Sequence, residues 1–555
     1  MKSKLHLLLA TLISLSVGCS KKEVSQLQSL QDGKKNAIST LGSPAGDVVG
    51  KITVGYQGWF AAIGDGSPIN AWWHWTQNWG ASPSSSNNGI KSWPDVRDYT
   101  STYATAWPNL NNGQQAKLFS SFTDQTVNTH FLWMQQNGID CAALQRFNPN
   151  GSEGPVRDAI TAKVKTAAET YGRKFYIMYD VSGWTNMQSE IKTDWTNKMS
   201  AYTTSSAYAK QNGKPVVCIW GFGFNDSNHS WSAAVCLDVI NWFKNQGCYV
   251  IGGVPTHWRT ESDDSRPSFL ATYSALNMIS PWMVGRIGNV NDVDNFYTNV
   301  NTPDQAYCND HGIDYQPCIL PGDLQEHQRA HGDFMWRQFY NMVRVGAQGI
   351  YISMFDEYNE GNQIAKTAES SAFIPAGANF VTLDEDGVAC SADYYLRLTG
   401  DGGKMLKGQI GLTASRPTQP IVGGGNPIPP PYGQTITLKG SNNLYVSSEN
   451  AQQAMNCNRA TAQGWEHFSV TNAGNGKVVL LNSGYYVSSE NGTQAINCNR
   501  TAIGPWEQFD WIDNGDGSIS LKGNNGAYVS SEGGTQAMTC TRTTIGATEK
   551  FKVNQ

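Results

Sequence analysis

The chain is poor in charged residues and carries no excess of positive charge. Asp, Glu, Lys and Arg make up 15% of its 555 residues, against about 25% in an average soluble domain. Forty basic and 45 acidic side chains give a formal net charge of −5. Because no basic surplus is available to displace counterions from phosphates, we expect no nucleic-acid partner. Disorder is also excluded, since 39% of the residues are hydrophobic and 11% are aromatic.

Long apolar runs are absent, and no mature segment reaches the ~18 apolar residues that a membrane-spanning helix needs. The first 19 residues contain Lys2 and Lys4, an apolar run at 7–17, and then Gly18 and Cys19, which is typical of an export signal. They resemble a bacterial lipoprotein signal, in which the cysteine becomes the lipidated N-terminus, so we expect lipidation at Cys19. An ordinary cleaved signal is the alternative, because Leu15 lies one place earlier than in that pattern.

The expected location follows from this signal. Residues 20–48 are polar and rich in Ser, Gly and Lys, which predicts a tether. We therefore expect an exported protein that is lipid-anchored to the outer membrane, on its periplasmic or cell-surface side, or else secreted. The lipid anchor is its only expected membrane contact, and we expect a monomer.

Metal-binding spacings are absent too. The 11 cysteines include no Cys-x-x-Cys, and Glu326, His327 and His331 have the order Glu-His-x-x-x-His rather than the His-Glu-x-x-His of zinc enzymes. The segments 291–295 and 513–517 are interpreted as polar loops rather than calcium sites. We predict no metal and no cofactor.

Disulfide pairing is left open by the sequence. Ten cysteines follow the signal, and an exported protein meets an oxidising compartment that permits disulfides. Cys308 and Cys318 flank one loop and could pair. Cys457, Cys498 and Cys540 recur at equivalent positions of a repeat, so we expect them to be small core residues.

Tryptophan is abundant, with 19 copies, and most of the polar character comes from neutral side chains and glycine. Flat aromatic rings pack against the apolar C–H faces of sugars, while amides and hydroxyls bond to sugar hydroxyl groups. This composition indicates a neutral, polyhydroxylated ligand, and we expect a polysaccharide or oligosaccharide partner.

The C-terminal part of the chain repeats one pattern three times after a Gly/Pro-rich linker at 413–434. The motif Tyr-Val-Ser-Ser-Glu recurs with Tyr445, Tyr486 and Tyr528 spaced 41 and 42 residues apart. Three units of about four short strands each must share one core, which predicts an all-β trefoil over 435–555. Three blades would be too few for a propeller, which usually has ~4–8.

These repeats resemble the fascin-like β-trefoils that are appended to carbohydrate-active enzymes. The resemblance implies a carbohydrate-binding module with up to three shallow sites, which would raise the local substrate concentration. The alternative is that Tyr445, Arg459 and their equivalents are structural, because any threefold core repeats its packing residues. Both interpretations stay open.

Residues 49–412 alternate short apolar runs with longer helix-period segments, which is typical of βα units and a parallel sheet. Eight runs are expected to be strands, at 52–56, 140–145, 175–179, 216–220, 249–252, 278–284, 315–320 and 349–355. Helices are expected between most of them, for example at 119–137, 156–171, 232–245 and 324–345. This pattern predicts an α/β fold, a (β/α)₈ TIM barrel. A doubly wound sheet is the alternative, but no Gly-rich phosphate motif follows the first strand.

The active site of such a barrel lies where strands end and loops begin. Aromatic and polar side chains follow nearly every predicted strand, and a single tryptophan could equally pack in the core. As a set they indicate a sugar-binding cleft. The expected substrate-binding residues are Tyr56, Trp59, Trp75, Arg146, Asp180, Trp184, Trp220, Trp258, Trp282, Asp323 and Asp356.

Three acidic residues, Asp356, Glu357 and Glu360, follow the last predicted strand directly. Cleavage of a glycosidic bond needs two carboxyl groups, one that protonates the leaving oxygen and one that is ionised and acts as base or nucleophile. Isolated acids of this kind are usually solvated loop residues. Their position after the final strand of a tryptophan-rich barrel favours Glu357 and Glu360 as catalytic residues.

The segment 351–364, Tyr-Ile-Ser-Met-Phe-Asp-Glu-Tyr-Asn-Glu-Gly-Asn-Gln-Ile, resembles the catalytic-strand motif of glycoside hydrolase families 71 and 99. The opening Val-Gly-Tyr-Gln-Gly-Trp at 54–59 is in keeping with it. In family 99 the first Glu of the motif is thought to deprotonate the sugar 2-hydroxyl, and the second acts as general acid and then base, with net retention. The resemblance implies these roles for Glu357 and Glu360.

The sequence therefore predicts an exported, retaining glycoside hydrolase that cleaves a neutral polysaccharide or oligosaccharide. The competing hypothesis is a non-catalytic glycan-binding surface lipoprotein, whose cleft holds sugar without cutting it. A transglycosylase, which would use the same residues with a sugar acceptor in place of water, is a third option.

Overall fold

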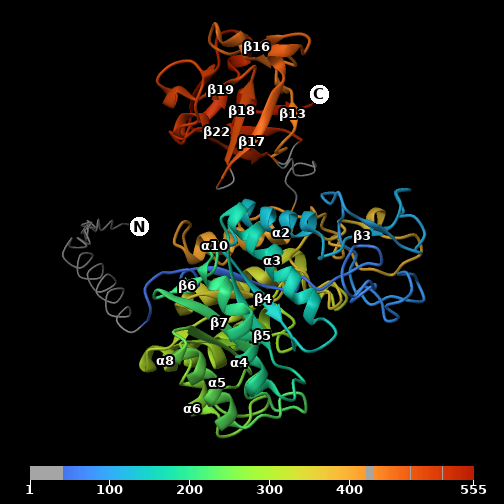
Figure 1. Cartoon of the computed structure of the whole chain (residues 1–555), viewed down its shortest axis with the longest axis vertical. Coiled ribbons are helices and arrows are strands. Elements are labelled where there is room, and N and C mark those ends of the chain that lie inside the picture. The colour runs from blue at the N-terminus through green and yellow to red at the C-terminus, as the bar shows by residue number, and fades with distance from the viewer. Residues whose placement is uncertain (1–41, 421–429, 475–476, 515–516, 555) are drawn as a thin grey trace, which may run out of the picture.

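The computed structural model describes residues 42–420, 430–474, 477–514 and 517–554 (Figure 1). The predicted export signal with Cys19, and most of the predicted tether, lie outside these residues. The last part of that tether is attached to the fold: Ser43 N donates to Asp314 Oδ1 at 2.8 Å, and Val48 is fully buried. The folded region therefore begins a few residues before position 49.

The first unit is a curled parallel sheet covered by helices, consistent with an α/β barrel (Figure 1). The strand order is β10-β9-β8-β7-β5-β4-β1-β12-β11, and a short antiparallel strand, β6, pairs with β7. Each of the eight predicted runs contains a strand. The bounds are β1 Ile52–Tyr56, β4 Cys141–Arg146, β5 Lys174–Asp180, β6 Lys210–Gln211, β7 Lys214–Trp220, β8 Tyr249–Val254, β9 Met278–Pro281, β10 Asp314–Tyr315, β11 Cys318–Ile319 and β12 Ile350–Ile352.

The predicted strand at 315–320 is split in two. β10 pairs with β9 and β11 pairs with β12, and only Gln316 and Pro317 lie between them. Gln316 N donates to Ile279 O on one side, and Pro317 O accepts from Tyr351 N on the other. Because proline has no N–H to donate, the ladder is interrupted at this point. The two ends of the strand order thus meet in one stretch of chain.

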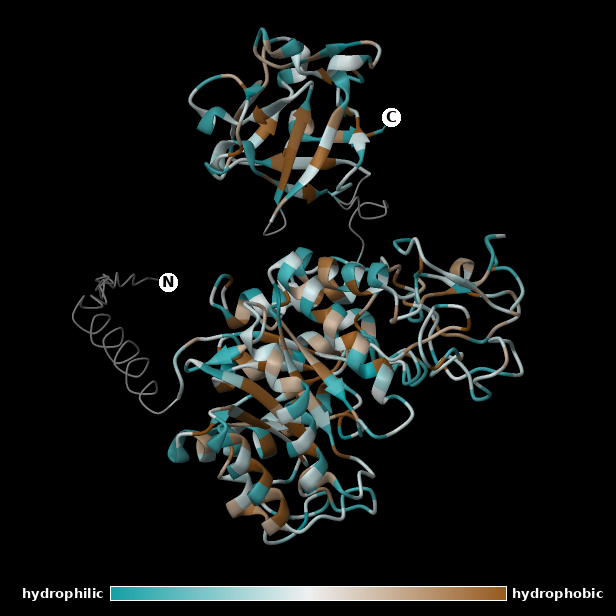
Figure 2. Ribbon diagram, in the orientation of Figure 1, coloured by the Kyte–Doolittle hydropathy of each residue, from teal (hydrophilic) through white to brown (hydrophobic). Residues whose placement is uncertain are grey.

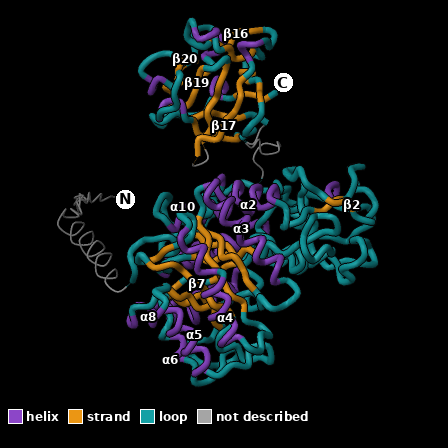
Figure 3. The backbone as a smooth tube through the Cα atoms, in the orientation of Figure 1, coloured by secondary structure: helices purple, strands orange, loops and turns teal. Residues whose placement is uncertain are grey.

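Helices pack around the parallel sheet, and Figure 3 shows them in purple around the orange strands. Side-chain caps fix where two of them begin: Thr123 accepts from Thr126 N, and Ser232 accepts from Val235 N. The first cap starts a helix later than the predicted residue 119. The helices are α2 Asp124–Gln136, α3 Gly154–Tyr171, α4 Met187–Asn197, α5 Ala233–Asn245, α6 Leu270–Tyr273, α7 Val290–Phe296, α8 Thr302–His311, α9 Asp333–Val345 and α10 Tyr394–Leu406.

The predicted helix at 324–345 begins only at Asp333. His327, Ala330 and His331 have positive φ angles, which a right-handed helix does not tolerate. The segment ahead of α9 therefore forms turns. This also removes the histidines from a helix face: His327 pairs with Glu385 and His331 with Asp386.

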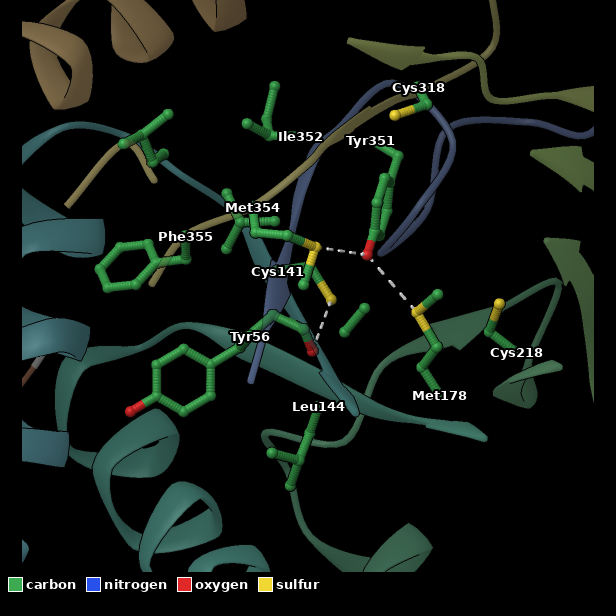
Figure 4. Packing of buried hydrophobic residues seen from close by; sticks show 14 of the residues in the cluster. Tyr56, Cys141, Leu144, Met178, Cys218, Cys318, Tyr351, Ile352, Met354 and Phe355 are labelled. Carbon is green, nitrogen blue, oxygen red and sulfur yellow. Dashed lines mark hydrogen bonds between the residues drawn. The ribbon is translucent and has the colours of Figure 1, made fainter. Parts of the chain in front are cut away.

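The interior of the curled sheet is filled by large side chains. Tyr351 of β12 reaches across it, and its hydroxyl donates to Met354 Sδ at 3.4 Å and Met178 Sδ at 3.6 Å (Figure 4). Gly55 of β1 lies beside this group, and a Cβ there would be only 2.2 Å from the Tyr351 hydroxyl oxygen. The residues that follow β12, including Asp356, Glu357 and Glu360, therefore lie next to closely packed side chains.

The cysteines form no disulfides within the described part of the chain, where all ten are unpaired and buried. The pairing considered for Cys308 and Cys318 is therefore not present, because these residues are buried separately in α8 and β11. Among the same residues no group of side chains is arranged to hold a metal ion, and no helix is both long and apolar enough to cross a membrane. The segment interpreted as a loop at 291–295 is helical, in α7, and the segment at 513–517 is only partly described.

The second unit is a separate antiparallel sheet with the threefold repetition seen in the sequence. Tyr445 pairs with Arg459, Tyr486 with Arg500, and Tyr528 with Arg542, each followed by a register shift. Figure 2 shows the hydrophobic residues concentrated on its strands. Its strands are β13 Thr435–Ile436, β14 Leu438–Gly440, β15 Tyr445–Ser447, β16 Asn456–Arg459, β17 Phe468–Gly474, β18 Lys477–Asn482, β19 Tyr485–Ser488, β20 Asn497–Arg500, β21 Phe509–Asp513, β22 Ile519–Lys522, β23 Tyr528–Ser530, β24 Thr539–Arg542 and β25 Phe551–Val553.

The three repeated cysteines lie in the core of this unit, as the sequence predicts. Cys457 Sγ donates to Leu444 O, Cys498 Sγ to Tyr485 O, and Cys540 Sγ to Ala527 O. Each thiol thus bonds to the start of the preceding strand of its own repeat or to the residue just before it.

Candidate active site

The two candidate catalytic residues lie on one turn after β12. Glu360 N and Gly361 N both donate to Glu357 O, at 3.2 and 3.1 Å. Glu357 is only 5% exposed, whereas Glu360 is exposed. The turn therefore presents one carboxyl from the protein interior and one at the surface, three residues apart.

The Glu357 carboxyl is held by a single hydrogen bond. Its Oε1 accepts from Gln57 Nε2 at 3.1 Å, and its Oε2 is buried without a partner among the described residues. Burial raises the pKa of Glu357 well above its ordinary value, and the charges of Glu360 and Asp356 raise it further, against the Gln57 hydrogen bond, which lowers it. A buried carboxyl group with a raised pKa holds its proton more firmly than a solvated one, which is typical of functional sites.

The Glu360 carboxyl has charged neighbours. Although the residue is exposed, loss of water around its carboxyl raises the pKa of Glu360; the nearby Lys91 ammonium lowers it and Asp323 raises it. Lys91 Nζ itself donates to Asp323 Oδ2 at 2.7 Å, and Lys91 N donates to Tyr358 O. Asp323 thus lies near Glu360, but its carboxylate is engaged by Lys91, and its role in binding substrate stays a prediction.

Asp356 supports the site from behind and is fully buried. Its two carboxylate oxygens accept from Gln57 N and Gly58 N, both at 2.8 Å. Burial raises the pKa of Asp356 to about 6, although these two backbone hydrogen bonds and the charge of Arg157 lower it. Asp356 therefore positions the end of β1, and with it the Gln57 amide that holds Glu357. It is a positioning residue rather than a group that could touch substrate.

Two buried arginines, which the sequence analysis missed, lock the loops around the carboxyl groups. Arg157 of α3 donates to the carbonyls of Gln57 and Gly58. Arg329 donates to Gly361 O at 2.8 Å, and also to the carbonyls of residues 322 and 363. No local pattern marks these arginines, because their partners are backbone atoms of distant loops.

An aromatic stack stands at the end of β1. The half-buried Trp59 ring stacks on His74 at 3.8 Å and on Phe147 at 5.6 Å, with interplanar angles of 17° and 14°. His74 Nε2 in turn lies 3.4 Å from Glu153 Oε1. The indole N–H of Trp59 has no partner within residues 42–420. Trp59, two residues after Gln57, thus belongs to a stack with His74 and Phe147, and its role in binding substrate stays a prediction.

A second polar group follows β5 and β7. Asp180 ends β5, and burial raises its pKa. Ser182 Oγ lies 2.9 Å from His229 Nε2, and His229 Nδ1 lies 2.8 Å from Asp226 Oδ1. Trp220, the last residue of β7, packs edge-on against both His229 and Trp282. Its indole N–H is buried with no partner in the ranges that the structure describes. Ser182, Asp226 and His229 lie in loops, and no sequence motif indicates that they contact one another.

Five of the expected substrate-binding residues lie in the packed core. Their side chains are at most 1% exposed, and each has at least one polar atom bonded inside the protein. No surface of these side chains is open to a substrate, so we leave them out of the site. They are Tyr56 (to His130), Trp75 (to Phe119 O), Arg146 (to Asp158 and Asp194), Trp184 (to Glu190) and Trp258 (to Asp304).

Comparison with known proteins finds distant structural similarity. No family model matches the chain, and no curated protein matches it. Two structures of a family 99 endo-α-mannosidase from Bacteroides thetaiotaomicron are similar, one of them in complex with bis-tris-propane. They share 13% and 14% identity over 65% of this chain and 98% of theirs, with TM-scores of 0.47 and 0.48.

The C-terminal unit has its own distant neighbour. A designed threefold-symmetric protein, ThreeFoil, is similar over 22% of this chain and 98% of its own length, at 15% identity and a TM-score of 0.21. Likeness at this level does not identify a family. The function of this chain therefore has to be inferred from the residues of its own site.

Proposed function

We propose that the chain is a glycoside hydrolase that cleaves a neutral polysaccharide or oligosaccharide with Glu357 and Glu360. One observation carries the proposal. Two carboxyl groups share one turn at the end of the last strand, one buried and one exposed, and both have raised pKa values. Acid–base catalysis near neutral pH needs carboxyl groups whose pKa lies near the working pH.

The proposed roles follow the resemblance to families 71 and 99. Glu357 removes the proton of the sugar 2-hydroxyl, whose oxygen attacks the anomeric carbon, while Glu360 protonates the departing glycosidic oxygen. In the second half Glu360 takes a proton from water, and the water oxygen attacks the anomeric carbon. The bond between that carbon and the sugar 2-oxygen breaks, and Glu357 returns its proton to the 2-oxygen. Two inversions give net retention. The exposed position of Glu360 suits contact with a leaving group, and the buried position of Glu357 suits contact with the bound sugar.

The remaining residues hold the sugar and the carboxyl groups. Gln57 aims Glu357, and Lys91 helps to set the protonation of Glu360. Trp59 and Trp220 each offer an unpaired indole N–H to a sugar hydroxyl. Asp180 and Trp282 lie beside Trp220 at the same ends of strands. These assignments require no metal and no cofactor.

The proposed architecture is a (β/α)₈ barrel, a linker and a β-trefoil. The barrel is supported by the strand order, whose two ends, β10 and β11, are consecutive in the chain. The trefoil is supported by the strand register that recurs in all three repeats. Export and lipid anchoring at Cys19, with the protein on the outer membrane or secreted, remain part of the proposal on the sequence alone. A monomer is likewise proposed.

The test separates the two carboxyl groups. Release of reducing sugar is measured against a panel of neutral polysaccharides for the wild type, Glu357→Gln, Glu360→Gln and the exposed neighbour Glu326→Gln. We expect Glu326→Gln to match the wild type and each of the other two to lose on the order of 10²–10⁴-fold in kcat.

A glycosyl fluoride of the correct sugar distinguishes the roles, because fluoride leaves without protonation. Glu360→Gln should still release fluoride in a first-turnover burst, because only its second step lacks a base, and Glu357→Gln should release none. Wild-type turnover in Glu360→Gln on the polysaccharide would refute the hydrolase. Sugar binding with no turnover by the wild type would favour the non-catalytic glycan-binding lipoprotein, and transfer to an added sugar acceptor would favour the transglycosylase.

A further inference from the structure

Two charged side chains from distant parts of the chain meet beside Glu360. Lys91 belongs to the long segment after β1, and Asp323 follows β11. Lys91 Nζ donates to Asp323 Oδ2 at 2.7 Å, and within the described residues Asp323 is the carboxylate that pairs with this ammonium. The fold thus brings one cation and one further anion to the residue proposed as the acid.

The backbone fixes both partners against the turn that carries Glu360. Lys91 N donates to Tyr358 O at 2.9 Å, two residues before Glu360. A Cβ on Gly361, one residue after Glu360, would lie only 2.8 Å from Asp323 Oδ1. Glycine at this position, where φ is +75°, therefore leaves the room that the Asp323 carboxylate occupies. The ion pair is built against the turn on both sides of Glu360.

The two partners differ in how freely they can move. The Asp323 side chain is 13% exposed, and its Oδ1 accepts from Gln325 N at 2.8 Å, which fixes its orientation. The Lys91 side chain is 39% exposed and carries its charge on a flexible four-carbon stem. Asp323 is therefore a fixed anchor, and the Lys91 ammonium is the group that can move toward a neighbouring anion.

Charges of both signs act on Glu360. Loss of water is the largest cause of its raised pKa; Lys91 lowers that pKa and Asp323 raises it. An ammonium closer to Glu360 would favour the charged carboxylate and so remove the proton that an acid needs. The other charged groups that face this cluster are Glu357 on the same turn, Glu326 after β11, and Arg329, which donates to Gly361 O.

We propose that Asp323 is a positioning residue that holds the Lys91 ammonium away from Glu360, so that Glu360 keeps the proton it donates in the first step. This inference rests on the proposed hydrolase, in which Glu360 is the general acid. Once Glu360 has passed its proton to the leaving oxygen, it is an anion and competes with Asp323 for the same ammonium. Lys91 then moves toward Glu360 and stabilises the carboxylate that acts as base in the second step. It returns to Asp323 when Glu360 takes a proton from water.

Chemical labelling measures the proton on Glu360 without any substrate. A water-soluble carbodiimide activates protonated carboxyl groups, and glycine ethyl ester then forms a stable amide. Because Glu360 is exposed, the full chain is labelled across the pH range in which carboxyl groups titrate, and mass spectrometry quantifies the amide on Glu360. Asp323→Asn removes the charge but keeps the Oδ1 acceptor for Gln325 N, and the labelling midpoint should fall by about one pH unit. Asp323→Glu, which keeps the charge, should stay close to the wild type.

Lys91→Gln separates positioning from simple repulsion between carboxylates. By itself it should raise the midpoint, the opposite of Asp323→Asn. In the Lys91→Gln background Asp323→Asn should shift the midpoint by less than half as much as in the wild type, because no ammonium is left to be released. Glu326→Gln, at an exposed acid of the same segment, is the matched control and should leave the midpoint unchanged. Equal shifts in the two backgrounds, or a midpoint that does not fall in Asp323→Asn, would overturn the proposal.

Activity reports on the same proton in the working enzyme. On a neutral polysaccharide that the wild type cleaves, the alkaline limb of the kcat/KM profile should move to lower pH in Asp323→Asn and to higher pH in Lys91→Gln. Fluoride release from the glycosyl fluoride should change less in both variants, because fluoride leaves without protonation, and this distinguishes a shifted proton from a damaged fold. Absence of any cleavage by the wild type would refute the hydrolase and with it the catalytic use of this proton. The labelling midpoints decide independently whether Asp323 keeps Lys91 from Glu360, and unmoved midpoints in an active enzyme would overturn the role of Asp323 alone.

Discussion

Replacing Gly55 by alanine adds one methyl group to the interior of the curled sheet, beside Tyr351 and Met354, which precede the turn that carries Glu357 and Glu360. The added Cβ would lie 2.2 Å from the Tyr351 hydroxyl oxygen and 2.3 Å from Met354 Sδ, where ordinary contacts begin at 3.4 Å. The Tyr351 oxygen must therefore move by more than 1 Å. Its hydrogen bonds to the sulfurs of Met354 and Met178 are lost in that movement.

The cost can be worked out from this packing. Overfilling a closely packed interior destabilises by about 1–3 kcal/mol, and a buried hydrogen bond adds about 1 kcal/mol. We expect Gly55→Ala to lower the free energy of unfolding by about 2–4 kcal/mol in total. Because Met354 precedes Asp356 and Glu357 by only two and three residues, kcat should fall as well.

A double-mutant cycle in urea checks the reasoning. Tyr351→Phe removes the oxygen that the new methyl group would meet, so Gly55→Ala should cost less in the Tyr351→Phe background than in the wild type. Gly411→Ala, where a Cβ meets nothing within 4 Å, is the control and should be nearly neutral. Additive costs of the two substitutions, or a Gly55→Ala variant as stable as the control, would refute the packing argument.

Three further changes test the electrostatics and the sugar contacts. The pKa of Asp356 rises from an ordinary 3.8 to about 6, so its contribution to stability is present below about pH 4 and is lost as the pH rises through 6. Asp356→Asn should remove about 3 kcal/mol of the wild-type decline between pH 4 and 7 in denaturant titrations, and parallel profiles would contradict this. Lys91→Gln removes a charge that lowers the pKa of Glu360, so the alkaline limb of the kcat profile should move to higher pH; an unmoved limb would exclude Lys91 from setting that protonation. Trp220→Phe deletes an unpaired indole donor and should raise KM about 3- to 10-fold with kcat nearly unchanged, whereas an unaltered KM would place Trp220 outside the sugar site.

Most helix and strand positions in the first unit follow from local sequence patterns, but the start of one helix does not. β1 lies at the predicted residues 52–56 because an apolar run bounded by polar residues has few alternatives. The predicted start of α9 at residue 324 was wrong, because the chain turns at His327 and His331, where φ is positive, and these residues pair with Glu385 and Asp386, which are distant in sequence. Local periodicity carries no information about such partners.

The candidate site also has features that the sequence predicts and features that it cannot predict. The sequence places Glu357 and Glu360 after the last strand, and the structure puts both on one turn. It could not separate Trp59, which remains partly exposed, from Trp75, which is sealed in the core, because both are tryptophans in the same loop region.

By itself the amino-acid sequence determined the alternation of strands and helices, the threefold repeat and the position of the acidic pair, because each is written in short-range periodicity or in motif spacing. Only the tertiary structure decided the raised pKa of Glu357 and the supporting role of Asp356. These depend on which distant groups remove water from a carboxyl group or satisfy its oxygens. Burial and hydrogen bonding of that kind arise only when segments far apart in the chain meet.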